Sequence, residues 1–519
     1  MATATGGRGV VPLLVIATAQ LMVVLDDSVV NIALPSIQRE LGVSAVHLPW
    51  VVYSFIVAFG ALLLLGGRLG DVWGRRRTLQ LGIVIFVVAS LTGGLGMNTG
   101  MLIAARALQG VGAALAAPNA LALIATTFID RKARDTALSL YGAMSGLGIV
   151  VGLLAGGLLT GTLGWRWVFF INIPIGLLVL LGSRTLVAAE PHQGRLGVAD
   201  AALGTGGMVA LVYAITRFGE DGIASAAGLI LLVVAAALLA VFLRTQARSR
   251  NPLVPLSLFT DRNRASAYLA MLLLAIGPMG TFYIITLYLQ QVVQFSPLQT
   301  GAAWLPFATG IVLGAGLAPK LLLRTGPRSV ATLGALLSAA AAWWFSTITL
   351  GTSYWLHLAP AMLVLALGFG LGVIALTQAA VYRTEPDKAG IASALLNSAQ
   401  QIGVAVGLAL LAGIAATTTA DAGDPAAPEA LASGYSSALA VAAGLLALAA
   451  AIAVVTLPAR PTTEQDADVD MKAAGAETEP DPLSRTPVLR RGSPRRGVRF
   501  ASSEAAGVPA SSPGPGRPR

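Results

Sequence analysis

The sequence is short of the residues on which most catalytic and metal sites depend. It contains no cysteine, which excludes disulfides, thiol catalysis and cysteine metal ligands. Its three histidines, His47, His192 and His357, form no paired metal-binding motif. No nucleophile and base occur in a recognisable arrangement, so we expect neither an enzyme nor a metal or organic cofactor.

Charged residues are scarce as well. Asp, Glu, Lys and Arg make up 11% of the 519 residues, and 55% are hydrophobic; soluble domains have about 25% charged residues. This balance predicts an integral membrane protein. The net charge of +10 does not indicate nucleic-acid binding, because the Arg residues fall mostly between apolar runs, where they set membrane topology.

Long apolar runs recur along the chain, and each is able to cross about 30 Å of hydrocarbon as a helix. Unbroken runs of this length exclude a barrel of short alternating strands. The sequence therefore predicts an all-α membrane protein with fourteen transmembrane helices, at residues 11–35, 48–67, 78–97, 101–127, 137–161, 165–184, 199–217, 223–243, 265–290, 298–319, 329–350, 355–381, 390–416 and 434–457.

Lys and Arg predict the orientation of these helices. They gather at the N-terminus and then in every second connecting segment, whereas Arg39, Arg166 and Arg217 fall on the opposite side. By the positive-inside rule both termini are cytoplasmic, and we expect a multi-pass plasma-membrane protein. One further basic residue, Arg106, lies inside the fourth run.

A weak internal repeat divides the chain. Gly67 to Arg77 (GRLGDVWGRRR) is echoed about 252 residues later by Pro319 to Arg328 (PKLLLRTGPR). Parallel halves of this kind are typical of secondary transporters, which bind substrate between the halves. We predict a six-helix half at 1–198, an inserted helix pair at 199–243, a second six-helix half at 244–457 and a disordered cytoplasmic tail at 458–519.

Two adjacent carboxylates, Asp26 and Asp27, lie in the first run. A charged group at membrane depth costs at least ~2.5–3.5 kcal/mol on insertion scales, so such a pair indicates a function. Neighbours on a helix point about 100° apart, and Asp27 shares a stripe with Gln20 and Asn31. Periodicity thus favours Asp27 as the proton carrier in a polar cavity. The alternative is that one or both acids hold an ion pair or cap a helix break.

Arg106 is the embedded opposite charge, and Gln109, Gly110 and Ala113 follow it on one helix face. A guanidinium is not deprotonated in proteins, so its role would be to set the charge state of a carboxylate or to bind water. The alternative is an ion pair without a transport role.

Two glycine-rich segments complete the pattern. The cytoplasmic segment between the second and third runs holds candidate gating residues, namely Gly67, Asp71, Gly74, Arg75 and Arg76. The fifth run presents a face of small residues for close helix contact, namely Gly148, Gly152, Gly156 and Gly157. Polar candidates for lining a substrate cavity, each with an interhelical hydrogen bond as the alternative, are Gln20, Asn31, Tyr53, Gln109, Asn119, Tyr141, Tyr283, Gln290, Asn397, Gln400 and Gln401.

Five motifs in order resemble those of the fourteen-spanner drug:proton antiporters of the major facilitator superfamily. These are Leu25 to Pro35 (LDDSVVNIALP), the Gly67 segment, Arg106 to Gly112 (RALQGVG), Trp165 to Pro174 (WRWVFFINIP) and Gly390 to Gly407. The resemblance implies a major facilitator fold and proton-driven export of hydrophobic, often cationic compounds. It assigns the motif carboxylate to Asp26 rather than Asp27, the coupling partner to Arg106, and the cytoplasmic gate to Asp71, Arg75 and Arg76.

The sequence departs from the family pattern at three places. Leu153 follows Gly152 where the antiporter motif usually has proline, Gln400 stands for an expected arginine, and Leu323 stands where Asp71 would repeat. The first departure weakens the argument for antiport, and the second removes a charge from the second half.

We therefore expect a monomeric exporter of small lipophilic, often cationic drugs, powered by the proton gradient and surrounded by membrane lipid. One alternative is a dedicated exporter of a single natural product or lipid. Another is a non-transporting membrane sensor or scaffold that uses the basic tail, which deletion of residues 460–519 would then inactivate.

Overall fold

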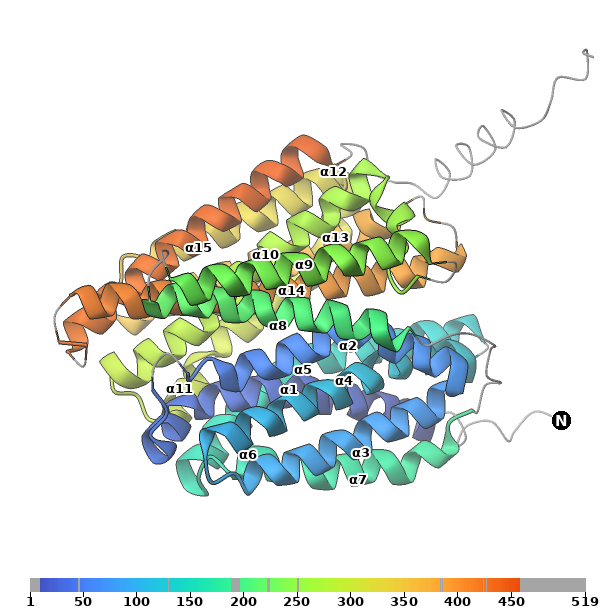
Figure 1. The fold of residues 1–519 in the computed structure, drawn as a ribbon, viewed down its shortest axis with the longest axis horizontal. Helices are drawn as coiled ribbons and strands as arrows, with labels where there is room; N and C mark the ends of the chain where they lie inside the picture. The colour runs from blue at the N-terminus through green and yellow to red at the C-terminus, as the bar shows by residue number, and fades with distance from the viewer. Residues whose placement is uncertain are drawn as a thin grey trace, which may run out of the picture. The chain divides into compact units, whose positions relative to one another are not determined.

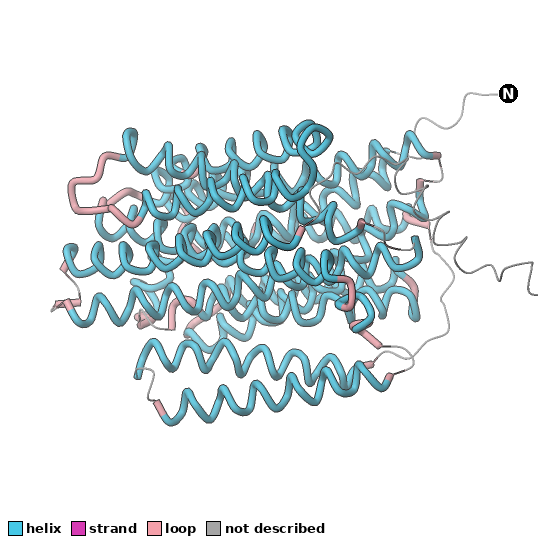
Figure 2. The backbone as a smooth tube through the Cα atoms, turned by 90° about the horizontal axis from the view of Figure 1, so that it is seen from above, coloured by secondary structure: helices cyan, strands magenta, loops and turns pink. Residues whose placement is uncertain are grey.

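The computed structural model describes residues 10–44, 47–128, 130–187, 197–221, 225–249, 252–382, 384, 386–422, 424–425 and 427–457. Over these residues the chain is helix and loop, and none of them forms a strand (Figure 2). The chain divides into a unit of Met1–Thr463 and a unit of Glu464–Arg519. The predicted tail at 458–519 lies outside the described residues, as do Arg8, Arg195 and His192.

Fifteen α-helices and four short η segments make up the described chain. In order they are α1 (Val10–Leu41), α2 (Trp50–Trp73), α3 (Arg75–Gly94), α4 (Thr99–Thr127), α5 (Arg131–Thr162), α6 (Trp167–Phe170), α7 (Asn172–Gly182), η1 (Ser183–Thr185), α8 (Val198–Asp221), α9 (Ala226–Arg248), η2 (Leu256–Phe259), α10 (Arg262–Leu287), η3 (Tyr288–Val292), α11 (Pro297–Ala303), α12 (Leu305–Phe345), η4 (Tyr354–Leu358), α13 (Ala359–Val381), α14 (Pro386–Asp421) and α15 (Pro428–Thr456).

Twelve segments of the described chain are helices long and apolar enough to cross a membrane, as expected of a multi-pass membrane protein. The sequence predicts fourteen, and the two counts differ at two places. The apolar part of α5 is the shorter helix Leu147–Thr162. The segment Pro297–Phe345 has 49 residues and covers two of the predicted runs.

The helices pack in two groups. Helices α1 to α7 contact one another, chiefly as α1 with α5 and α4 with α2 and α3, and α10 to α15 form the second group. Helices α8 and α9 lie side by side as a pair, shown in green in Figure 1. Contacts of α14 with α2, and of α11 with α5, join the two groups.

Two glycines with positive φ mark corresponding bends about 252 residues apart. Gly74 (φ 106°) separates α2 from α3, and Gly326 (φ 80°) interrupts the helical backbone within α12. Only glycine adopts such angles without a steric cost. The glycine-rich composition of Gly67 to Arg77 favours a loop, and this expectation is wrong outside Gly74, because α2 continues to Trp73 and α3 begins at Arg75. The Gly74 N–H donates to the Gly70 carbonyl and the Thr78 N–H donates to the Gly74 carbonyl, so helical hydrogen bonding reaches the turn from both sides and a single glycine makes the turn.

The same close helix contact occurs beside each bend. A Cβ built on Gly82 of α3 would lie 2.6 Å from the Gly112 carbonyl oxygen of α4. A Cβ built on Gly334 of α12 would lie 2.5 Å from the Gly368 carbonyl oxygen of α13. Two pairs of small residues thus let two pairs of helix backbones touch, in agreement with the internal repeat.

Candidate functional site

Asp26 of α1 lies at the centre of a closed polar cluster. Its side chain has no exposed surface, and its Oδ2 forms an ion pair with Arg106 of α4. Its Oδ1 accepts hydrogen bonds from Gln109 Nε2 at 2.9 Å and from Asn172 Nδ2 at 2.7 Å. The carboxylate is therefore held by three side chains from two other helices, α4 and α7.

Arg106 is held through its Nε and Nη1 atoms. Its Nε donates to the Val51 carbonyl of α2 at 2.9 Å, and its Nη1 also donates to Gln109 Oε1 at 2.9 Å. The guanidinium carbon lies 4.5 Å from the centre of the Phe55 ring, a cation–π distance. Gln109 in turn donates to the Ser90 hydroxyl of α3 at 2.8 Å. The cluster thus links α1, α2, α3, α4 and α7. A change in the charge of Asp26 would therefore alter hydrogen bonds that connect all five helices.

The glycine face of α5 brings α1 into this position. A Cβ on Gly148 would lie 2.9 Å from Val24 Cβ, and one on Gly152 would lie 2.7 Å from Ser28 Cβ. Gly156 meets the Val29 backbone in the same way, at 3.0 Å. Gly157, by contrast, faces the second helix group, where Pro297 O would lie 2.7 Å from its Cβ. With one side of α1 pressed on α5, Asp26 points to α4 and α7.

Asp27 has a different environment from its neighbour. It is half-buried, and no described residue gives a hydrogen bond to its buried Oδ1. Asn31 Nδ2 donates to the backbone carbonyl of Asp27 at 2.9 Å and not to its carboxylate. The family motif points to Asp26, which is the acid that pairs with Arg106. The helical period points to Asp27, which lies on the polar stripe of α1.

The polar stripe of α1 meets the second helix group. Gln291 Nε2 of η3 donates to Gln38 Oε1 at 3.0 Å, and Gln290 Nε2 donates to the Ile32 carbonyl at 3.0 Å. Tyr435 of α15 donates from its hydroxyl to Gln291 Oε1 at 2.7 Å. These bonds join the two groups at the end of α1 beyond the acidic pair.

The other cavity candidates are dispersed. Asn119 donates to the Gly66 carbonyl of α2 at 2.9 Å and to the Leu115 carbonyl at 2.8 Å, so both bonds fasten helix backbones. Tyr53 and Tyr283 are both buried. Gln20, Tyr141, Gln400 and Gln401 are half-buried, and Asn397 is exposed. Gln401 packs its Cβ at 2.7 Å from where a Cβ on Gly60 would lie.

The gating candidates form a cluster at the junction of α2 and α3. Arg75 donates to Asp71 Oδ1 at 3.2 Å and to the Ala122 carbonyl of α4 at 3.2 Å. Arg76 donates to the Leu186 carbonyl at 3.3 Å. Gly67 lies close to Pro118 of α4. The arginines thus tie the start of α3 to the ends of α4 and η1.

Three contributors were missed by the sequence reasoning. Asn172 and Ser90 belong to the Asp26 cluster, and Glu40 forms an ion pair with Arg166 and accepts from Trp165 Nε1 at 2.8 Å. The segment Trp165 to Pro174 contains Arg166 and Asn172 among aromatic residues of the kind that anchor helices at a membrane interface. Trp165 and Phe169 are instead buried, and Trp167 is exposed. The segment therefore fastens α1 at two points, Glu40 and Asp26.

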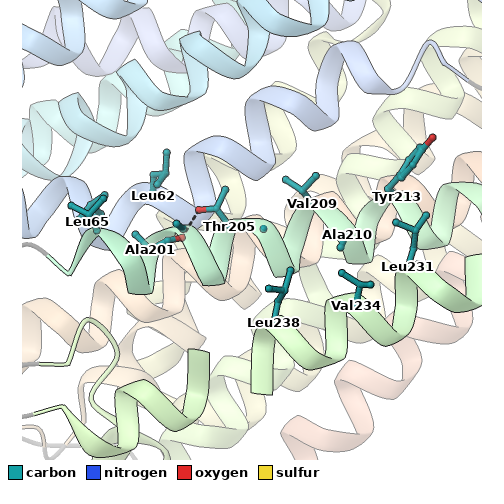
Figure 3. A pocket seen from close by; sticks show the side chains of 13 residues that line it. Leu62, Leu65, Ala201, Thr205, Val209, Ala210, Tyr213, Leu231, Val234 and Leu238 are labelled. Carbon is teal, nitrogen blue, oxygen red and sulfur yellow. Dashed lines mark hydrogen bonds between the residues drawn. The ribbon is translucent and has the colours of Figure 1, made fainter. Parts of the chain in front are cut away.

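A separate groove of about 560 Å³ opens between α2, α8 and α9. Its lining is almost wholly apolar, with Leu62, Leu65 and Leu238 among the contributors and Tyr213 near one end (Figure 3). The hydroxyl of Thr205 donates a hydrogen bond to the Ala201 carbonyl at 2.8 Å. No residue of the Asp26 cluster lines this groove.

Comparison with protein families and with known proteins gives a consistent result. The family model described as Major Facilitator Superfamily matches residues 16–408. The puromycin resistance protein pur8 of Streptomyces alboniger is 45% identical over 461 residues, which cover 86% of this chain and 91% of that protein. The cephamycin export protein CmcT of Amycolatopsis lactamdurans is 35% identical and covers 86% of this chain and 92% of its own length.

Solved structures share the fold at low sequence identity. A bacterial homologue of the human lysosomal transporter Spinster, in an inward-facing conformation, has a TM-score of 0.60 at 17% identity, over 87% of this chain and 97% of that chain. The POT family transporter PepTSo has a TM-score of 0.62 at 16% identity, over 85% and 97% of the two chains. At these identities the likeness concerns the fold alone.

Proposed function

The chain belongs to the major facilitator superfamily of membrane transporters and is not an enzyme, and we propose that it exports lipophilic, often cationic drugs or antibiotics in exchange for protons. The relatives at 31–45% identity include proteins named for resistance to, or export of, puromycin, cephamycin and tetracenomycin C. The proposed direction of transport is outward across the plasma membrane, by alternating access of two helix groups.

The buried ion pair of Asp26 with Arg106 is the observation that carries proton coupling. Both side chains have no exposed surface. Protonation neutralises Asp26 and turns an acceptor of three hydrogen bonds into a group that must itself donate. Arg106 keeps its charge and loses its partner. Because the cluster joins five helices, the protonated and ionised forms favour different helix arrangements, and this difference couples the proton to the movement.

The proposed topology has fourteen spans. Two observations support it: α5 has 32 residues with an apolar C-terminal part, and α12 has 41 residues interrupted at Gly326. A helix crosses the hydrocarbon with about 20 residues, so α12 is long enough for two crossings. We assign residues 1–198 and 244–457 to the two halves and 199–243 to the inserted pair, with both termini in the cytoplasm.

Substitution of Asp26 tests proton coupling directly. Asp26→Asn keeps the size of the side chain and cannot exchange a proton. We expect it to abolish proton-driven export in inverted membrane vesicles, measured with and without a proton gradient. Full retention of gradient-driven export by Asp26→Asn would sink the assignment.

A dedicated exporter of one natural product is the second candidate, because several relatives are named after a single compound. A panel of structurally unrelated substrates separates the two candidates. Export of one chemical class only would favour the dedicated exporter, and export of several would favour the multidrug transporter.

A further inference from the structure

The groove between α2, α8 and α9 offers almost no polar partner to a ligand. Its volume of about 560 Å³ lies within the range of roughly 300–1,000 Å³ that is usual for small-molecule sites. Only Thr205 and Tyr213 bring hydroxyls to its lining (Figure 3). Thr205 donates to the Ala201 carbonyl, and the Tyr213 hydroxyl accepts a hydrogen bond from Arg217 at 3.3 Å. The groove is therefore suited to hydrocarbon and not to a ligand with polar groups.

The groove opens to the surface on which the exposed apolar side chains of α9 lie. Val209 and Val234 line the groove, and both are 42% exposed. Outside the groove on the same helix pair, Ile230 is 64% exposed and Val233 is 68% exposed. A membrane-spanning helix with such a surface is in contact with lipid tails. The medium that reaches the groove is thus the hydrocarbon of the membrane.

The two ends of the groove differ in charge. At one end the Tyr213 ring meets the Trp50 ring edge to face, with centroids 5.6 Å apart. The Arg217 guanidinium lies 5.5 Å from the centre of the Tyr213 ring and forms an ion pair with Asp221 at 3.4 Å. This end is bounded by aromatic rings, and the charge beside it is balanced.

The other end of the groove lies at Val198, and Arg248 of α9 is level with it. Helices α8 and α9 run antiparallel, and a Cβ on Gly204 would lie 3.5 Å from the Phe242 ring. Six residues from each member of this contact, toward the same end of the pair, are Val198 and Arg248. Arg248 lies fourteen residues beyond the lining residue Val234 and, at 100° per residue, within about 40° of its face. The side chain of Arg248 is exposed.

Helix α2 brings a second arginine to the Val198 end. The contact of Trp50 with Tyr213 sets the level of α2 against α8, and Leu65 lies as far from Trp50 along α2 as Val198 lies from Tyr213 along α8. Figure 3 accordingly shows Leu65 and Tyr213 at opposite ends of the groove. Arg68 follows Leu65 by three residues, on the same helix face, and is half-buried. Arg68 therefore lies one turn beyond the groove.

The charges of Arg68 and Arg248 are not balanced by the residues that the structure describes. Neither guanidinium forms an ion pair within the described ranges, whereas Arg75, on the next helix, pairs with Asp71. Arginine binds phosphate strongly, because its planar fork donates two parallel hydrogen bonds. Under the proposed topology this end of the groove is cytoplasmic, and basic residues on that side of a membrane attract anionic lipid headgroups.

The length of the groove agrees with a lipid tail. Helix α8 rises about 22 Å from Val198 to Tyr213. One leaflet contributes about 15 Å, half of the hydrocarbon thickness of a bilayer. A tail that enters at the basic end would thus be accommodated over its whole depth in the leaflet before it reached Tyr213.

We propose that this groove holds one acyl chain of an anionic phospholipid from the cytoplasmic leaflet, whose phosphate is bound by Arg68 and Arg248. The choice of leaflet rests on the proposed topology, whereas the binding site does not depend on what the protein exports. Helix α8 contacts α2 of the first helix group and α14 of the second. A chain between α2 and α8 would therefore hold the inserted helix pair against the first group.

Photo-crosslinking of the full-length protein tests the site without any measurement of transport. The protein is reconstituted in phosphatidylcholine liposomes with a trace of phosphatidylglycerol that carries a diazirine on one acyl chain. Mass spectrometry of a digest locates the cross-links, which we expect on the groove-lining residues of α2, α8 and α9. Unlabelled phosphatidylglycerol in excess should lower this labelling at least about tenfold, and inorganic phosphate should not, because the proposed ligand needs its tail. A phosphatidylcholine probe with the same diazirine should label the groove at least about tenfold less.

Variants of the two arginines test the headgroup contact. A basic residue near the membrane surface strengthens binding of an anionic lipid about fivefold, so Arg68→Gln/Arg248→Gln should lower labelling of the groove at least about tenfold. The control Arg324→Gln removes an exposed arginine of α12, in the second helix group, and should change labelling less than about twofold. Equal labelling of the groove by the two lipid probes, or by the double variant and the wild type, would overturn the proposal.

A second pair of variants tests the tail contact. Each buried CH₂ group contributes about fourfold to binding, so Val209→Trp, which fills the groove, should lower labelling at least about tenfold. Val233→Trp places the same side chain on the exposed face of α9, outside the groove, and should leave labelling unchanged. Equal effects of the two tryptophans at a wild-type elution profile would contradict the site. So would a groove that neither lipid probe labels, because a drug or a second copy of the chain would then be its occupant.

Discussion

At the scale of single residues, the ion pair of Asp26 and Arg106 is stabilised by its further hydrogen bonds. Removing two charges from water costs several kcal/mol per ion, and attraction between them compensates only where other donors and acceptors are satisfied. Here Gln109, Asn172 and the Val51 carbonyl supply such bonds, whereas Nη2 of Arg106 has no hydrogen-bond partner among the described residues. The pair therefore tolerates loss of both charges better than loss of one.

Substitution of Arg106 should be strongly destabilising. Arg106→Met leaves the Asp26 carboxylate buried without a counter-charge, which typically costs about 3–5 kcal/mol. The double variant Asp26→Asn/Arg106→Met removes both charges and should recover most of that loss. Unfolding of the detergent-purified proteins, followed by denaturant or heat, measures the difference. A double variant as unstable as Arg106→Met would show that the charge of Asp26 is not the cause.

Sequence reasoning reached part of this cluster. The motifs identified Asp26 and Arg106, because each is a charge in an apolar run. Asn172 and Ser90 are neutral, and Asn172 is 146 residues away from Asp26 along the chain. Gln109 was among the neutral polar candidates, but a neutral polar residue in a membrane helix carries no cost large enough to distinguish cluster members from the other candidates, so only the three-dimensional contact reveals Asn172 and Ser90.

At the scale of helices, the glycine face of α5 determines where α1 lies. Gly148, Gly152 and Gly156 recur every four residues and all face α1. The spacing predicts a close helix contact, and the structure supplies the partner. Gly157, one residue outside this stripe, faces α11 instead. Helix α5 thus contacts α1 on one side and the second helix group on the other.

A methyl group at Gly152 should separate α1 from α5. The Cβ of Gly152→Ala would lie 2.7 Å from Ser28 Cβ and 3.0 Å from the Leu25 carbonyl oxygen, closer than van der Waals contact. Overpacking of this kind costs typically about 1–3 kcal/mol. We expect lower thermal stability in detergent and reduced export, because the displacement reaches Asp26.

The matched control lies on the same helix. At Gly161 the nearest atoms to a Cβ are 3.9 Å away. Gly161→Ala should therefore change stability by less than about 0.5 kcal/mol, apart from the gain in helix propensity. Equal effects of the two alanines would argue against a specific contact of Gly152 with α1.

At the scale of the whole molecule, the sequence predicts the helical membrane fold, and the count of fourteen spans stays a prediction beside the twelve candidate spans of the described chain. Long apolar runs are unambiguous, because each must be a helix in hydrocarbon. The positions at which the helical backbone is interrupted are harder to predict. The segment from Gly67 to Arg77 has the composition of a loop, yet only Gly74 leaves the helical conformation. Within α12, one glycine makes the bend and the helical hydrogen-bonding pattern continues past it. Composition identifies the residues able to bend, and packing decides which of them do.

A reversible cross-link between the two helix groups tests alternating access. Gly161 of α5 and Leu298 of α11 lie opposite each other, and a Cβ built on Gly161 is 3.9 Å from Leu298 Cβ. Cβ atoms joined by a disulfide are about 3.5–4.5 Å apart. The chain has no cysteine, so Gly161→Cys/Leu298→Cys introduces its only thiols, and Leu298 is 46% exposed to an oxidant. We expect oxidation to join the helices and reduce export at least about tenfold, and a reductant to restore it, because the groups must separate here once per cycle.

The corresponding single-cysteine variants are the controls for effects of the oxidant other than the bridge. Gly161→Cys and Leu298→Cys cannot form the bridge within one chain, so the oxidant should leave their export unchanged. Mass spectrometry of a proteolytic digest measures the fraction of double-variant chains that carry the bridge. If export by the bridged protein continues at the rate of the reduced protein, separation of α5 from α11 is not required for transport. A fully bridged and inactive protein that recovers on reduction would instead place the moving contact at Gly161 and Leu298, at the same interface as Gly157 and Pro297.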